Sequence, residues 1–208
     1  MKKLLHIIAT PRGSESRTLS VSKAFLDVFK TKYPECEIEE LNLFEEKLPD
    51  LTVKKVNGKY VLLSGKDLSG DLKESWKEIV SFIERFLYAD SYLISTPMWN
   101  FSIPYRLKHY IDIILQPKYL FQYTPNGPEG LAKGKKMAII TSRGGDYSAE
   151  DFRKFDLQTP YLYTVFNFAG ISDIVFVNAQ PMDAMGPEIQ AKKIKEAQAQ
   201  AREIAKNF

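Results

Sequence analysis

Cysteine is almost absent from this chain of 208 residues, because Cys36 is its single cysteine. One cysteine excludes an internal disulfide and favours a reducing compartment, so we expect a cytoplasmic protein. Long hydrophobic runs are also missing, since no stretch approaches the roughly 20 apolar residues of a membrane span. The first nine residues have the charge and apolarity of a signal peptide's start. Their apolar part is too short for the hydrophobic region of a signal peptide, however, because the charged Arg12 and Glu15 lie where that region should continue. We therefore interpret them as a strand and expect no membrane partner.

A strong excess of charge of one sign is lacking as well. The chain has 29 Lys and Arg against 26 Asp and Glu, a formal net charge of +3, and its lysines are dispersed. We therefore expect no nucleic-acid partner. The two histidines, His6 and His109, lie far apart and do not form a metal-ligand set with one cysteine. With 44% hydrophobic residues, the length suits one well-filled core, and we expect a single domain over residues 1–208.

Short apolar runs alternate with helical patterns along the chain. The expected strands are residues 3–9, 37–43, 91–95, 136–141 and 174–177. The expected helices are residues 16–32, 72–87, 107–115, 160–169 and 187–208. This alternation predicts an α/β fold with a doubly wound, five-stranded parallel sheet of order 2-1-3-4-5. Two segments stand apart: an irregular excursion over residues 44–70 with at most one short helix, and a protruding hairpin or loop over 119–130.

The loop after the first expected strand is rich in hydroxyl groups and arginines. Thr10, Ser16, Arg17 and Thr18 lie where this loop enters a helix. Free N–H groups and the positive end of the helix dipole favour an anion there, which predicts a phosphate site. The alternative is a single N-cap beside a surface charge. The loop lacks both the Gly-Lys-Ser/Thr ending of a P-loop and the Gly-x-Gly-x-x-Gly spacing of a dinucleotide fold.

The loop after the third expected strand combines a sulfur, an indole, an amide and a phenyl ring. Its residues are Pro97, Met98, Trp99, Asn100 and Phe101. Such groups can enclose a conjugated ring and hydrogen-bond its edge. Packing of the large side chains in the core is the alternative, but the amide of Asn100 would then need partners.

The loop after the fourth expected strand reads Ser142, Arg143, Gly144 and Gly145. Adjacent glycines permit a close approach of backbone to ligand, and their N–H groups can stabilise negative charge developing on a ring. In the expected strand order these three loops converge at one edge of the sheet. A phosphate site, a ring-edge site and a ring-oxygen site together describe flavin mononucleotide (FMN).

Several motifs in this order resemble one known family. They are Pro97-Met98-Trp99-Asn100-Phe101, Asn126-Gly127-Pro128-Glu129-Gly130-Leu131, Gly134-Lys135-Lys136, Thr141-Ser142-Arg143-Gly144-Gly145 and Thr159-Pro160-Tyr161-Leu162. The chain resembles the FMN-dependent NADH-azoreductases, also described as FMN-dependent NADH:quinone oxidoreductases, from Lys3 through the C-terminal helix. This resemblance implies a flavodoxin-like fold, bound FMN and a homodimer. It also implies phosphate contacts from the first loop and ring contacts from the other two. Trp99 stands where the family often has Tyr, and residues 44–70 match it poorly.

The resemblance further implies a two-step reaction with NADH as co-substrate. NADH gives hydride to the flavin N5 and leaves, and a quinone or azo compound then takes the electrons. The flavin N5 is the reactive centre, so no catalytic side chain is expected and both histidines are interpreted as structural. Phe121, Tyr123 and Phe168 are candidates for a hydrophobic substrate-binding lid across a dimer interface, with core packing as the alternative for Phe168.

Two other classes of protein share the expected topology. A flavodoxin-type one-electron carrier is usually strongly acidic for docking, whereas this chain carries +3. A receiver-type signalling domain needs a carboxylate cluster after its first strand to bind magnesium, and Ala9-Thr10-Pro11-Arg12 stands there instead. The carrier therefore remains the alternative. The sequence leaves open the physiological acceptor and the choice between NADH and NADPH.

Overall fold

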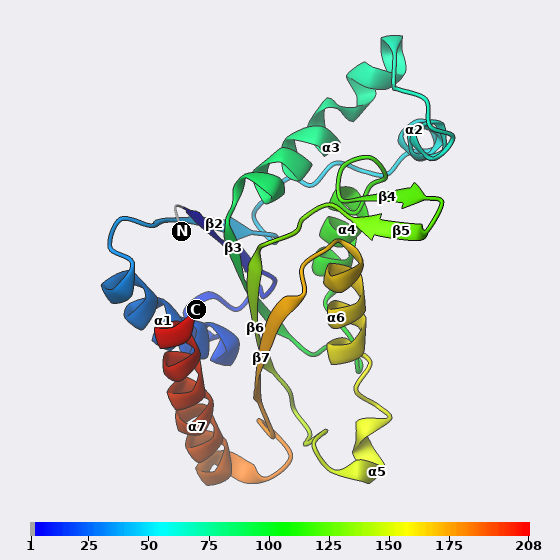
Figure 1. The fold of residues 1–208 in the computed structure, drawn as a ribbon. Coiled ribbons are helices and arrows are strands. Elements are labelled where there is room, and N and C mark those ends of the chain that lie inside the picture. Colours follow the sequence, from blue (N-terminus) through cyan, green and yellow to red (C-terminus); the bar gives the residue numbers. More distant parts are fainter. Residues whose placement is uncertain (1–2) are drawn as a thin grey trace.

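A five-stranded parallel sheet forms the middle of the molecule (Figure 1). The computed structural model describes residues 3–208, so Met1 and Lys2 of the expected domain lie outside the described part. The strands of the sheet are β1 (Lys3–Ile8), β2 (Glu37–Asn42), β3 (Ser91–Pro97), β6 (Lys136–Ser142) and β7 (Asp173–Ala179). The expected parallel α/β sheet is confirmed, with every strand within a few residues of its predicted bounds.

The order across the sheet is β2-β1-β3-β6-β7. The expected order, 2-1-3-4-5, numbered only the strands of this sheet. Two further strands, β4 (Phe121–Thr124) and β5 (Gly127–Gly130), form an antiparallel hairpin between β3 and β6 in the chain. The last two positions of the sheet are therefore occupied by the sixth and seventh strands along the chain.

Helices cover both faces of the sheet (Figure 1). One face packs against α1 (Arg17–Lys32) and α7 (Gly186–Asn207), and the other against α3 (Gly70–Tyr88), α4 (Tyr105–Ile114) and α6 (Gln158–Phe168). Side chains of a strand alternate between the faces, so Leu4 joins the core under α1 and α7 whereas Leu5 joins the other core. Among the described helices, none combines the length and apolarity needed to cross a membrane.

The segment expected to be irregular contains a well-formed helix, α2 (Val53–Leu63). The Thr52 hydroxyl caps it by accepting a hydrogen bond from the N–H of Lys55 at 3.4 Å. The helix docks on α3 through Gly58, where an added Cβ would lie 2.1 Å from Nε1 of Trp76. Trp76 in turn donates from Nε1 to the Lys55 carbonyl at 2.9 Å. A glycine at the contact weakens the apolar pattern, which explains why the sequence favoured an irregular segment.

The hairpin expected over residues 119–130 is present, and it lies at the amino-terminal edge of the sheet (Figure 1). Gly130 at its end touches the backbone of Gly170, just before β7 begins; an added Cβ on Gly130 would lie 2.2 Å from the Gly170 nitrogen. Two short helical turns escaped prediction, a 3-10 turn at Gly13–Glu15 and α5 (Glu150–Arg153). Both lie beside the loops at the opposite, carboxyl-terminal edge.

Candidate cofactor-binding site

The loops after β1, β3 and β6 meet at the carboxyl-terminal edge of the sheet and line one cavity of about 230 Å³. The predicted convergence is therefore present in the structure. Predicted site residues that line the cavity are Thr10, Ser16, Arg17, Thr18, Pro97, Met98, Trp99, Ser142, Arg143 and Gly144. Arg12, Met182 and Asp183 complete the lining.

The first wall of the cavity is the N-terminus of α1. Ser16 caps the helix, because its hydroxyl accepts a hydrogen bond from the N–H of Leu19 at 3.3 Å. The single-cap alternative accounts for Ser16 but not for Arg17, whose Nη1 lies 2.6 Å from Oδ1 of Asp183. The hydroxyls of Thr18 and Ser142 lie 2.6 Å apart and join the first loop to the third. A helix N-terminus with a nearby guanidinium suits an anion.

The second wall contains a tight turn. Trp99 and Ser102 exchange both backbone hydrogen bonds, at 3.0 and 2.9 Å. Between them Asn100 and Phe101 have φ angles of 47° and 68°. Asparagine tolerates this left-handed region, but for phenylalanine it costs on the order of 1 kcal/mol or more. Trp99 and Phe101 are 38% and 49% exposed, so packing in the core does not explain these two side chains.

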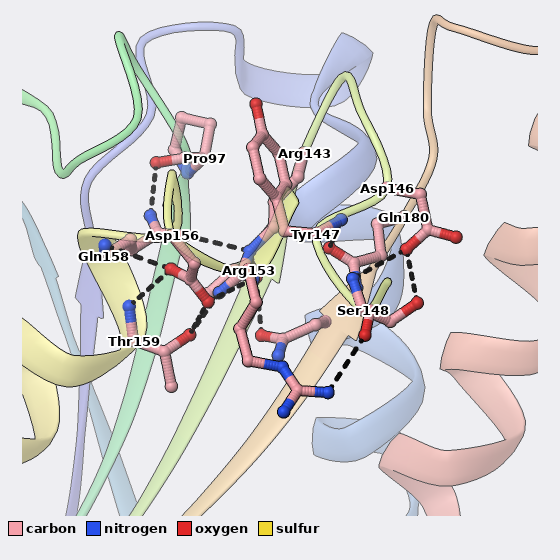
Figure 2. Close-up of polar contacts among 12 residues, drawn as sticks. Pro97, Arg143, Asp146, Tyr147, Ser148, Arg153, Asp156, Gln158, Thr159 and Gln180 are labelled. Atoms are coloured by element: carbon pink, nitrogen blue, oxygen red, sulfur yellow. Dashed lines mark hydrogen bonds and ion pairs between the residues drawn. The ribbon is translucent and has the colours of Figure 1, made fainter. Parts of the chain in front are cut away.

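The third wall is backbone, because the side chain of Arg143 points away to a buried network (Figure 2). Its Nη1 lies 2.9 Å from Oδ2 of Asp156, and Nη2 donates to the Thr159 hydroxyl at 2.5 Å. Its Nε donates to Oε1 of Gln158 at 3.2 Å. Burial raises the pKa of the Asp156 carboxyl, but hydrogen bonds from Thr159 and the charge of Arg143 outweigh it and hold that pKa below its usual value. The guanidinium is thus committed to the protein.

Several predicted residues lie outside this cavity. Asn100 is absent from its lining, and Phe101 and Gly145 line an adjacent apolar cavity of about 550 Å³. Phe121 and Phe168 pack together with ring centroids 4.9 Å apart, and Tyr123 beside them is 66% exposed. These three belong to the hairpin and the end of α6, at the amino-terminal edge of the sheet (Figure 1). Within one chain they cannot cover the cavity.

Two further groups of residues at the site escaped prediction. Met182 and Asp183 follow β7, whose predicted position beside β6 already placed its loop at this edge. The N–H of Asp183 donates to the Gly144 carbonyl at 3.0 Å, and a Cβ on Gly144 would lie 3.1 Å from Oδ2 of Asp183. Asp156 lies just before α6 and Gln158 is the first residue of that helix, and nothing in their local sequence indicates a buried role.

The parallel sheet and the anion-favouring loop at its carboxyl-terminal edge define a protein of the flavodoxin-like α/β class. A family model described as flavodoxin-like fold matches residues 2–205. The chain therefore belongs to the flavodoxin-like family that includes FMN-dependent NADH:quinone oxidoreductases. The resemblance read from the sequence motifs is confirmed.

Relatives cover the whole chain. An FMN-dependent NADH:quinone oxidoreductase of Coprothermobacter proteolyticus is 37% identical over 209 residues, which is 100% of both chains. The azoreductase of Bacillus anthracis superposes with a TM-score of 0.90 at 29% identity over 100% of both chains. An FMN-dependent NADH-azoreductase from Bacillus anthracis in complex with FMN gives a TM-score of 0.84 at 30% identity, covering 99% of this chain and 100% of that one.

Proposed function

We propose that this chain is an FMN-dependent oxidoreductase that uses NADH to reduce quinones and aromatic azo compounds by two-electron hydride transfer. The observation that carries the proposal is a cavity in which an anion-favouring helix N-terminus meets two loops suited to a flat ring. The names of full-length relatives, which are NADH:quinone oxidoreductases and azoreductases, support it. When bound, FMN supplies N5 as the atom that accepts and passes on hydride.

The residues of the cavity divide between the two ends of the cofactor. Thr10, Ser16, Arg17 and Thr18 would hold the phosphate, and the phosphate would compete with Asp183 for the guanidinium of Arg17. The ring would lie against the two remaining loops, through Pro97, Met98, Trp99, Asn100, Phe101, Ser142, Arg143, Gly144 and Gly145. Backbone N–H groups in those loops would stabilise the negative charge of reduced FMN. The cavity suits this cofactor because it joins an anion-favouring helix N-terminus to the two loops proposed to hold the ring.

We propose that the active form is a homodimer. Phe121, Tyr123 and Phe168 cluster at the edge of the sheet opposite to the cavity of the same chain. A second copy that lies antiparallel to the first, related by a two-fold axis, would bring each chain's aromatic cluster over the other chain's cofactor. There the cluster would act as the lid of the substrate site. The exposure of Tyr123, at 66%, supports a surface that is covered in the dimer.

Residues 1–208 act, in this proposal, as one FMN-binding domain in the cytoplasm with no nucleic-acid or membrane partner. The single cysteine and the near balance of charges support this setting.

The order of substrate binding tests the proposed reaction. If NADH and the acceptor use the same face in turn, initial velocities measured over a grid of NADH and menadione concentrations give parallel double-reciprocal lines. Intersecting lines would contradict the two-step exchange. A one-electron carrier would instead show no turnover of NADH with menadione and would stop after one electron on photoreduction.

A further inference from the structure

Both loops that would face the flavin ring are tied to one short segment, residues 155–159, which joins the connection after α5 to the first turn of α6. We infer that this segment, here called the clamp, is a positioning device that holds residues 97–101 and 142–145 at a fixed separation and thereby tunes the bound FMN. The inference rests on the proposed function, but it assigns a role to Asp156, Gln158 and Thr159, which are expected to contact neither cofactor nor substrate.

The clamp holds the ring-edge loop at both ends. The amide Nε2 of Gln158 donates to the carbonyl of Pro97 at 2.9 Å, and the backbone N–H of Leu157 donates to the carbonyl of Phe101 at 3.1 Å. The ring of Phe155 packs on the ring of Phe101 with centroids 5.8 Å apart. The contacts of Leu157 and Phe155 restrain Phe101, whose left-handed backbone is unfavourable for a large side chain. They therefore offset part of the backbone strain at Phe101.

The same clamp holds the third loop through Arg143 (Figure 2). Arg143 is 2% exposed, and its guanidinium contacts Asp156, Gln158 and Thr159. Gln158 is fully buried and bridges the two loops: its oxygen accepts from Arg143 while its nitrogen donates to Pro97. The orientation of this amide follows from chemistry, since arginine only donates and a carbonyl only accepts.

Every side-chain nitrogen and oxygen of Arg143, Asp156, Gln158 and Thr159 has a hydrogen-bond partner in this network. A buried network of this kind is rigid. Backbone N–H groups in the two loops can stabilise negative charge on reduced FMN only if their positions are fixed in advance. Loosening the clamp should therefore weaken the binding of reduced FMN more than the binding of oxidised FMN. The expected consequence is a lower two-electron reduction potential of the bound cofactor.

Two substitutions of Gln158 separate positioning from charge. Gln158→Glu keeps an oxygen for Arg143 but replaces the donor to Pro97, whereas Gln158→Met is uncharged and removes both hydrogen bonds. We expect both variants to bind FMN with about a tenfold loss in the ratio of affinities for reduced and oxidised FMN. That loss corresponds to a potential lower by about 30 mV. Equilibrium reduction of the FMN-loaded variants against a reference dye measures it.

Gln200→Glu is the matched control. Gln200 is exposed on α7, on the other face of the sheet, and its amide donates to the Phe176 carbonyl at 3.5 Å. The Gln200→Glu substitution introduces the same charge as Gln158→Glu without touching the clamp. The reduction potential of the bound FMN should therefore stay at the wild-type value. If Gln158→Met does not fold, Thr159→Val, which removes the hydroxyl shared by Arg143 and Asp156, carries the same prediction.

Unchanged potentials in folded Gln158 variants would overturn the inference. A shift in Gln158→Glu alone would also overturn it, because the added charge would then be the cause. These failures differ from a failure of the proposed function, in which the wild-type protein itself would not retain FMN or would not be reduced by NADH.

Discussion

Asn100 has two possible roles at the site: to form the tight turn with its backbone, or to bond the flavin ring with its amide. It occupies a left-handed position in the tight turn, which its type tolerates, yet it does not line the cavity. If the side chain of Asn100 serves only the turn, glycine can replace it, because glycine adopts the same backbone without strain. If its amide bonds the ring edge, the change to glycine removes that hydrogen bond and weakens FMN binding.

Asn100→Gly therefore isolates the side chain. We expect FMN affinity to fall about tenfold, the effect of losing one hydrogen bond of roughly 1.4 kcal/mol. Asn100→Ala should lose the same affinity and in addition about 1 kcal/mol in the free energy of unfolding, because the backbone strain of alanine is present with and without FMN. Quenching of FMN fluorescence on titration with protein measures both affinities. Wild-type affinity in Asn100→Gly would remove the amide from the proposed ring contacts.

His6 is a buried base whose protonation state follows from its neighbours. Ser22 uses its hydroxyl hydrogen on the Thr18 carbonyl at 3.0 Å, so at 2.6 Å it must accept from Ser95. Ser95 must then accept from Nε2 of His6 at 2.7 Å. Nδ1 is left without a hydrogen-bond partner, and the nearest carboxylate, that of the exposed Glu40, lies 3.8 Å away. Burial lowers the pKa of His6 to about 4, and the charge of Lys30 acts in the same direction.

This shift makes folding sensitive to pH. In the unfolded chain His6 takes up a proton below about pH 6.5, whereas in the folded chain it does so only near its lowered pKa. Stability is therefore lost as the pH falls from about 6.5 toward 4, by about 2 kcal/mol at pH 5. Urea unfolding at pH 7.5 and 5 measures the loss. His6→Gln cannot titrate and should lose that much less, so parallel losses in the two proteins would contradict the assignment.

At the scale of elements, the docking of α2 on α3 depends on one glycine. Gly58→Ala would place a Cβ within the indole of Trp76 and force the helices apart. We expect a loss of about 1–3 kcal/mol in the free energy of unfolding, typical of overpacking, with FMN binding retained. Thermal unfolding measures it, and Asn57→Ala, at an exposed position of the same helix, is the control. Equal melting temperatures for Gly58→Ala and the wild type would mean that α2 does not dock at Trp76.

The elements that the sequence predicted well are those with a strong apolar period. The buried strands and α3 are examples, since Trp76, Ile79 and Ile83 recur at helical spacing and all lie in the core. Elements too short to show a period, such as α5, escaped prediction. The clamp escaped for another reason: Gln158 acts on Pro97, a residue 61 positions away, and only the folded chain brings them together.

At the scale of the whole molecule, the strand order predicted where the cavity forms, because parallel strands deliver their following loops to one edge. The hairpin with Phe121 and Tyr123 lies at the opposite, amino-terminal edge, because α4 returns the chain to that edge before β6 begins. The strand order could not predict whether a second copy brings this aromatic cluster over the cavity.

The proposed homodimer accounts for that placement. Light scattering should give twice the mass of the 23.8 kDa chain. Tyr123→Ala should raise the KM for menadione by roughly tenfold, as an interfacial aromatic contact is lost, with the rate of reduction by NADH unchanged. Tyr88→Ala, at another exposed tyrosine, is the control. A monomer with full activity would contradict the dimeric lid.

Anaerobic mixing of the purified, FMN-loaded protein with NADH tests the central claim most directly. The account predicts stoichiometric FMN in the wild-type protein, full bleaching of its visible absorbance by NADH, and return of the colour when menadione is added. Failure to retain FMN, or a flavin colour that NADH does not bleach, would contradict the assignment of this cavity to an FMN-dependent oxidoreductase.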